Sequence, residues 1–188
     1  PGAKPIIFFS ILAYVDPGDE VLYVNPGFPM YESVANFIDA KTIPIPLLEE
    51  NDFRADPEYI KSKITKKTKM IIINSPENPT GGVLTKEDLE IIADSIANRN
   101  DILVLSDEIY SRIIYESTHH SIASLPGMKE KTILLDGFSK TYAMTGWRLG
   151  YMAGPKESMK WVARLLSHSV SQATTFVQRA GVAALRGP

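Results

Sequence analysis

Short β-type runs alternate with helical runs along this chain, and this alternation restricts the possible fold more than any other feature of the sequence. The candidate strands are apolar runs at residues 20–24, 42–45, 69–73, 102–106, 132–135 and 147–153. Strands separated by helices are typical of a parallel sheet that is covered by helices on both faces. We therefore expect an α/β fold with three α/β/α layers and a mostly parallel central sheet.

Two of the helices have readable start signals. Asp56-Pro57 supplies an N-cap and a first-turn proline for a helix that continues to about residue 64, and Thr85-x-x-Asp88 has the spacing of a capping box. Apolar residues at helical spacing predict further helices from about Pro155 and across residues 170–185. Pro and Gly cluster in short turns between these elements, so the 188 residues are expected to form one domain.

Composition excludes several classes of protein. With 44% hydrophobic and 22% charged residues, the chain is able to bury a core, and a net charge of −2 argues against electrostatic binding of nucleic acid. No apolar run approaches the ~18 residues that a membrane span requires. The chain has no cysteine, which fits a reducing compartment, so we expect a cytoplasmic protein without a membrane or nucleic-acid partner. The adjacent pair His119-His120 has no third ligand at suitable spacing, so no metal site is expected.

The stretch from Gly137 to Gly150 combines one lysine, small residues and an arginine directly after an apolar run. The amine of Lys140 becomes a nucleophile where desolvation or neighbouring cations disfavour its ammonium form, and it can then bond to an aldehyde cofactor. Ser139 and Arg148 are suitable donors for a phosphate beside it. A single Ser-Lys pair usually lies in an exposed loop, so the interpretation depends on the whole stretch.

Two other polar groups follow apolar runs. Asp107 ends the run at residues 102–106, where open α/β sheets bind ligands, and Tyr110 faces the same side if the chain turns helical there. Asn78 lies in the loop Asn74-Ser75-Pro76-Glu77-Asn78-Pro79-Thr80-Gly81, which follows another apolar run. Considered alone, the first motif also fits a helix cap and the second an ordinary turn.

In this order, Asn78-Pro79-Thr80-Gly81, Ser106-Asp107-Glu108-Ile109-Tyr110 and the stretch from Ser139-Lys140 to Gly150 resemble the fold-type I pyridoxal-phosphate enzymes of the class I/II aminotransferases. The resemblance extends over essentially the whole chain. It implies that residues 1–188 form the large, cofactor-binding domain, with an N-terminal segment and a C-terminal small domain outside this sequence.

The resemblance also implies a role for each site residue. Lys140 would form the Schiff base with pyridoxal 5'-phosphate and act as the proton shuttle, while Asp107 would pair with the pyridinium nitrogen. Tyr110 and Asn78 would hydrogen-bond the phenolic oxygen of the cofactor. The phosphate would be bound by Arg148, Ser139 and the helix N-terminus at Gly2, Ala3 and Lys4, and Phe28 would lie against the ring.

The implied function is transfer of an amino group between an L-amino acid and a 2-oxo acid, in an enzyme that is a homodimer when intact. The same motifs are compatible with a carbon–sulfur β-lyase, because the reaction depends on groups outside them. A catalytically inert module that only binds the cofactor, or only has a structural role, is a third alternative. The sequence motifs do not identify the amino acid or the oxo acid.

Overall fold

A computed structural model of the chain describes residues 1–187 and contains one six-stranded sheet in the order β2-β1-β3-β4-β5-β6. The strands are β1 (Glu20–Asn25), β2 (Lys41–Pro46), β3 (Thr68–Asn74), β4 (Leu103–Asp107), β5 (Thr132–Gly137) and β6 (Gly150–Ala153). Neighbouring strands run parallel from β2 through β5, and β6 pairs antiparallel with β5. The expected mostly parallel sheet is confirmed.

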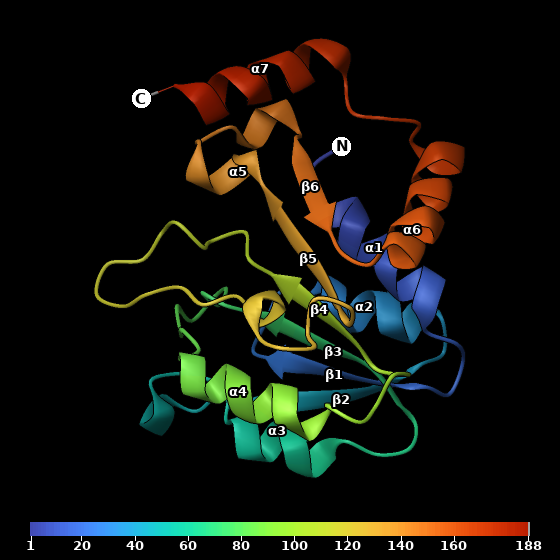
Figure 1. The fold of residues 1–188 in the computed structure, drawn as a ribbon, viewed down its shortest axis with the longest axis vertical. Coiled ribbons are helices and arrows are strands. Elements are labelled where there is room, and N and C mark those ends of the chain that lie inside the picture. Colours follow the sequence, from blue (N-terminus) through green and yellow to red (C-terminus); the bar gives the residue numbers. More distant parts are fainter. Residues whose placement is uncertain (188) are drawn as a thin grey trace.

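Helices cover both faces of this sheet, so the three expected layers are present (Figure 1). The helices α1, α2 and α6 lie on one side and α3 and α4 on the other, while α5 and α7 lie at the end of the molecule formed by β5 and β6. Their bounds are α1 (Lys4–Tyr14), α2 (Met30–Phe37), α3 (Pro57–Lys63), α4 (Lys86–Ser95), α5 (Phe138–Thr141), α6 (Lys156–Ser169) and α7 (Thr175–Arg186).

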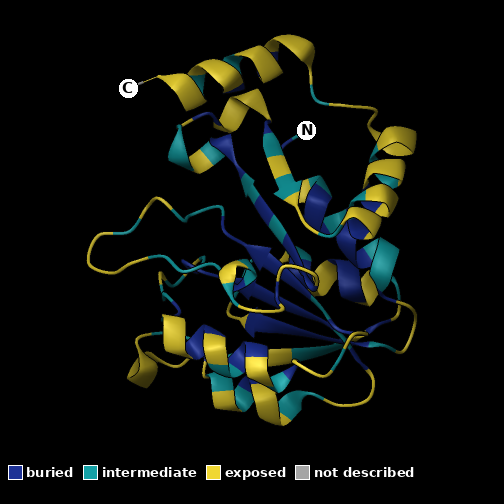
Figure 2. Ribbon diagram, in the orientation of Figure 1, coloured by how far each residue is buried: buried dark blue, intermediate teal, exposed yellow. Residues whose placement is uncertain are grey.

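The hydrophobic core lies on the central strands, which are the most deeply buried part of the chain (Figure 2). In β3, the residues from Met70 to Asn74 are all buried, and the run is continuously apolar until its last residue. A strand with both faces covered by helices needs apolar side chains in both directions, which explains why the sequence does not alternate. The predicted caps are also present, because Asp56 accepts from the Glu58 N–H and Thr85 forms a capping box with Asp88.

The boundaries of two elements differ from the sequence prediction. The last strand begins at Gly150, because Thr145–Trp147 form a 3₁₀ turn and Arg148 has a left-handed backbone with φ of 52°. The last predicted helix, over residues 170–185, begins later than expected, because α7 starts at Thr175 and ends at Arg186.

The short helices α2 and α5 were not predicted. Neither has a side-chain hydrogen bond at its N-cap, so the local sequence lacks the usual start signal.

None of the helices formed by residues 1–187 has the length and apolar character that crossing a membrane requires. Within the same residues, no three His, Asp or Glu side chains gather in a way that suits a metal ion.

Candidate functional site

The carboxyl ends of the parallel strands meet at one edge of the sheet, and the polar motifs follow these ends. From β1 the chain passes to β2 on one side and then to β3 on the other, so the order of the sheet reverses between β1 and β3. In open α/β sheets, ligands bind outside the carboxyl ends at such a reversal. The topology therefore places the segments that follow β1, β3, β4 and β5 around one location.

A cavity of about 180 Å³ lies at this edge and collects nearly all of the predicted site residues. Those lining it are Ala3, Lys4, Phe28, Asn78, Asp107, Tyr110, Ser139, Lys140 and Arg148. Gly2 is not among the lining residues but lies directly behind Arg148, whose carbonyl oxygen accepts the Gly2 N–H at 2.6 Å. Residues far apart in the sequence therefore converge as the motifs predicted.

Asp107 is the last residue of β4 and only 5% exposed. Its Oδ2 accepts from the Tyr31 hydroxyl at 2.8 Å, and its Oδ1 accepts from the Ile109 N–H at 3.2 Å. Burial raises the pKa of the Asp107 carboxyl to about 6, with smaller contributions from the charges of Asp136 and Glu108, whereas the two hydrogen bonds oppose the rise. A cationic group in the cavity would favour the carboxylate form.

Lys140 lies on α5 and is solvent-exposed, so its amine is accessible at the cavity. The Nζ atom lies 5.6 Å from the centroid of the Tyr110 ring. No helix forms after Asp107, and Tyr110 instead lies in a turn, from which it still lines the same cavity. The helical condition stated for Tyr110 is therefore not met, yet Tyr110 and Asp107 line the same cavity.

A second part of the cavity is suited to an anion. The first N–H groups of an α-helix have no acceptor within the helix, and α1 begins at Lys4 beside the Arg148 guanidinium. Gly2 has a φ of +77°, and a Cβ atom there would lie 2.5 Å from Nη2 of Arg148. The positive φ favours glycine at position 2, and any side chain there would also displace the Arg148 guanidinium.

The aromatic side of the cavity is formed by Phe28, which follows β1 and packs edge-on against Tyr31 with 5.8 Å between ring centroids. The Nζ atom of Lys4 lies 5.4 Å from the Phe28 ring centroid. The Phe28 ring thus provides an apolar surface between a cationic group and the buried Tyr31–Asp107 pair.

Sequence reasoning missed three polar residues that line the cavity, namely Tyr31, Asn74 and Thr145. Tyr31 is completely buried on α2, a helix that was not predicted. Asn74 ends β3, where its Nδ2 donates to the Asp107 carbonyl oxygen and its Oδ1 accepts from the Asn78 N–H, each at 3.0 Å. A polar residue at the end of an otherwise apolar strand was the available signal for Asn74.

Comparisons with known proteins agree with this geometry. The sequence model for aminotransferase class I and II matches residues 1–188. A bifunctional aspartate aminotransferase and glutamate/aspartate-prephenate aminotransferase from Petunia hybrida is 46% identical over 98% of this chain and 39% of its own length. An aspartate aminotransferase from Pyrococcus abyssi is 44% identical over 98% of this chain and 48% of its own.

Solved structures give the same result. An aromatic aminotransferase from Pyrococcus horikoshii has a TM-score of 0.94 and 42% identity, covering 99% of this chain and 50% of that one. An aspartate aminotransferase from Thermus thermophilus with maleate has a TM-score of 0.93 and 38% identity, covering 98% of this chain and 48% of that one. The chain spans half or less of the length of these relatives. From the family match and these identities, the chain belongs to the class I and II aminotransferases.

Proposed function

We propose that residues 1–188 are the cofactor-binding domain of a pyridoxal-phosphate-dependent aminotransferase, which transfers an amino group between an L-amino acid and a 2-oxo acid. The observation that carries this proposal is the convergence of an amine, a buried carboxylate and a guanidinium on one cavity. The names of the relatives support transamination over carbon–sulfur elimination, since those compared above are aminotransferases.

The chemistry of the donor set fits pyridoxal 5'-phosphate. When bound, this group supplies an aldehyde that forms a Schiff base with an amine, and a ring that accepts an electron pair. The cavity offers Lys140 as the amine and Asp107 as a buried anion for a protonated ring nitrogen. The raised pKa of Asp107 fits this pairing, because a buried carboxylate without a cation is destabilised.

Lys140 and Asp107 divide the proton chemistry between them. Lys140 Nζ would carry the proton between the substrate Cα and the C4′ position of the cofactor, because this side chain lines the cavity and its amine is accessible. Asp107 Oδ atoms would hold the ring nitrogen in its protonated form. Tyr31 would keep the Asp107 carboxylate oriented through the 2.8 Å hydrogen bond.

The anion-binding part of the cavity would hold the phosphate. Arg148 offers a planar set of N–H donors and Ser139 a hydroxyl, and the start of α1 at Ala3 and Lys4 offers backbone N–H groups and the positive end of the helix dipole. Gly2 donates its own N–H to the Arg148 carbonyl oxygen and would contribute by holding this segment beside Arg148. Asn78 and Tyr110 would donate to the phenolic oxygen, and Phe28 would pack against the ring face. These groups bind and orient the cofactor.

The substrates would be an L-amino acid and a 2-oxo acid. The activity is proposed for the full-length protein, because the curated and solved relatives are about twice as long as this chain. The homodimer and the cytoplasmic location stay predictions from the sequence.

The test is an absorption titration of the full-length protein with pyridoxal phosphate. We expect a near-visible band that Lys140→Ala abolishes, while Lys129→Ala retains it because Lys129 is exposed and does not line the cavity. Identical spectra and cofactor affinities for the wild type and Lys140→Ala would refute the proposal and favour an inert module. Ammonia release from the amino acid without a 2-oxo acid would indicate elimination in place of transamination.

A further inference from the structure

A single buried amide connects the segment after β3 with the segment after β4. Asn74 is 3% exposed, and both polar atoms of its side chain are used. Its Nδ2 donates to the Asp107 carbonyl oxygen and its Oδ1 accepts from the Asn78 N–H, both at 3.0 Å. The Cα atoms of Asn74 and Asp107 are also partners in the β3–β4 register.

The two segments joined in this way carry separate parts of the site. Asp107 and Asn78 both line the cavity, yet they belong to different strands and their own side chains share no recorded hydrogen bond. Asn74 therefore connects the backbone of Asp107 to the backbone of Asn78. A second bond, from the Ser75 N–H to the same Asp107 carbonyl at 3.3 Å, fixes the start of the loop but does not reach Asn78.

The bridge requires the chemistry of a short amide. It needs a donor and an acceptor on one planar group, and the carboxylate of Asp, the hydroxyl of Ser and an apolar side chain each fail to supply both in that geometry. Because the group is buried, losing either bond leaves a polar atom without a partner. The position therefore specifies how far Asn78 stands from Asp107.

We propose that Asn74 is a positioning residue, which sets the spacing between Asn78 and Asp107 so that both side chains reach one bound ring at the same time. The proposal rests on the proposed function and deepens it. Asn74 acts through Asn78, so its effect should depend on the presence of the Asn78 side chain. A purely structural amide would change stability alone.

The test uses the full-length protein with pyridoxal phosphate and the variant Asn74→Asp, which keeps the size and the acceptor for Asn78 but sets a carboxylate oxygen against the Asp107 carbonyl. We expect cofactor affinity to fall about tenfold, the size of effect of losing a hydrogen bond to a charged group. The pH midpoint of the near-visible band should move upward by about one unit, because an Asn78 held out of place stabilises the deprotonated form less. Asn25→Asp is the matched control, since Asn25 also ends a strand but is exposed.

A double-mutant cycle with Asn78→Ala distinguishes positioning from stability. If Asn74 acts through Asn78, Asn74→Asp should shift the midpoint in the wild type and leave it unchanged in the Asn78→Ala background. Equal shifts in both backgrounds, or a lowered melting temperature with an unchanged midpoint, would overturn the proposal. Asn74→Ser is the second variant, and failure of both variants to fold would also overturn it. Absence of the band in the wild type would instead refute the proposed function.

Discussion

Burial and hydrogen bonding have opposing effects on the pKa of the Asp107 carboxyl group. Burial favours its protonated form, and hydrogen bonds from Tyr31 and Ile109 favour its ionised form. Burial is the larger effect, so the pKa of Asp107 rises to about 6. A cation placed beside this buried carboxyl group would stabilise its ionised form.

The contribution of the Tyr31 hydroxyl is tested by Tyr31→Phe. Removing the donor should raise the pKa of Asp107 above its wild-type value of about 6, because one bond that favours the carboxylate is lost. Carbon-detected NMR titration of the cofactor-free protein measures this pKa directly. Tyr115→Phe is the control, since Tyr115 is 93% exposed. An Asp107 pKa in Tyr31→Phe equal to that of the wild type would contradict the assigned hydrogen bond.

The raised pKa of Asp107 also predicts how stability depends on pH. Between the ordinary value of 3.8 and about 6, the unfolded chain loses its proton before the folded one does, so the free energy of unfolding falls as pH rises. The loss is on the order of 3 kcal/mol and is complete above that window.

Asp107→Asn removes this dependence. Between pH 4 and 6, the wild type should therefore lose stability relative to Asp107→Asn, when cofactor-free protein is unfolded with urea at each pH. Parallel stability curves for the two proteins across this range would show that the Asp107 carboxyl titrates normally.

At the scale of elements, side chains bind backbone groups at both ends of α4. Thr85 and Asp88 form the capping box at its start. At its end, Lys131 is 9% exposed and its Nζ donates to the carbonyl oxygens of Ile96 at 2.8 Å and Ala97 at 2.7 Å. The Lys131 ammonium thereby donates to two carbonyls just beyond the helix end, of which that of Ile96 also accepts the Arg99 N–H at 3.0 Å.

Lys131→Met keeps the apolar part of this side chain and removes both hydrogen bonds. We expect the free energy of unfolding to fall by about 2 kcal/mol, because the carbonyls of the buried Ile96 and of Ala97 both lose a charged donor. Lys129→Met, at an exposed position two residues earlier, should change it by less than about 0.5 kcal/mol. Urea denaturation compares the two, and equal midpoints would contradict the capping role of Lys131.

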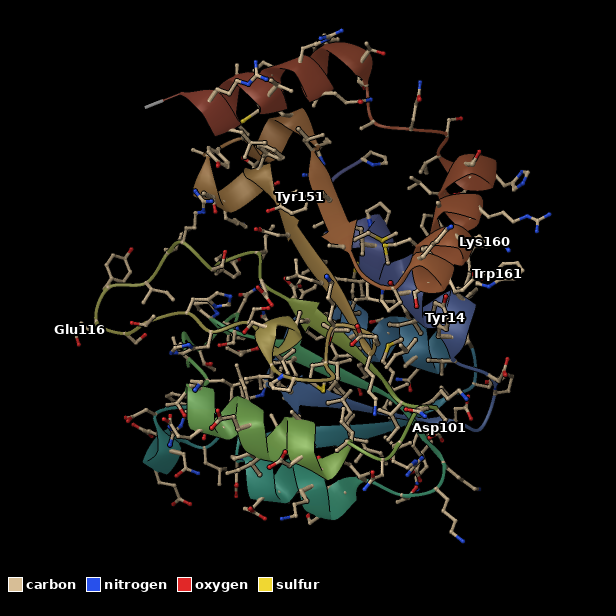
Figure 3. All side chains as sticks on the ribbon, viewed as in Figure 1. Tyr14, Asp101, Glu116, Tyr151, Lys160 and Trp161 are labelled. Atoms are coloured by element: carbon tan, nitrogen blue, oxygen red, sulfur yellow. The ribbon has the colours of Figure 1, made fainter. Side chains whose placement is uncertain are left out.

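The loop after β4 is a second element whose form depends on buried polar contacts. It projects away from the sheet, with Glu116 in its outer part (Figure 3). Glu108 closes its base by accepting from the Ser121 hydroxyl at 2.6 Å and by contacting His119 Nε2 at 2.9 Å. Tyr110 lies just inside this closed base, which explains how it holds a position in the cavity without a helix.

Local sequence predicted the strands well and the ends of some elements poorly. The runs over residues 69–73 and 132–135 lie inside β3 and β5, because short apolar runs bounded by turn residues are typical of strands buried on both faces. The predicted start of β6, at residue 147, was wrong. Arg148 has a left-handed backbone, and its carbonyl oxygen accepts the N–H of Gly2, a residue distant in the sequence. No local pattern records a contact of that kind.

At the scale of the whole molecule, the parallel sheet makes the site predictable. Residues that follow different strands converge because parallel strands end at the same edge. The motifs predicted that Asn78, Asp107 and Lys140 lie close together, and all three line one cavity. The contact of Tyr31 with Asp107 was not predictable, because it depends on how α2 packs over the sheet.

The surface of the two last helices differs from the rest of the molecule. Much of α6 and α7 is exposed (Figure 2), and Phe176, Leu185 and Trp161 are 67%, 59% and 45% exposed. Activity should be measured on the full-length protein, because the chain spans half or less of its relatives' length.

The central claim is that Lys140 bonds to the aldehyde of pyridoxal phosphate. The direct measurement is borohydride reduction of the cofactor-loaded full-length protein, followed by proteolysis and mass spectrometry of the peptides. We predict a stable cofactor adduct on the peptide that contains Lys140, and unmodified lysines at exposed positions such as Lys129. An adduct spread over surface lysines, with Lys140 unmodified, would contradict the account.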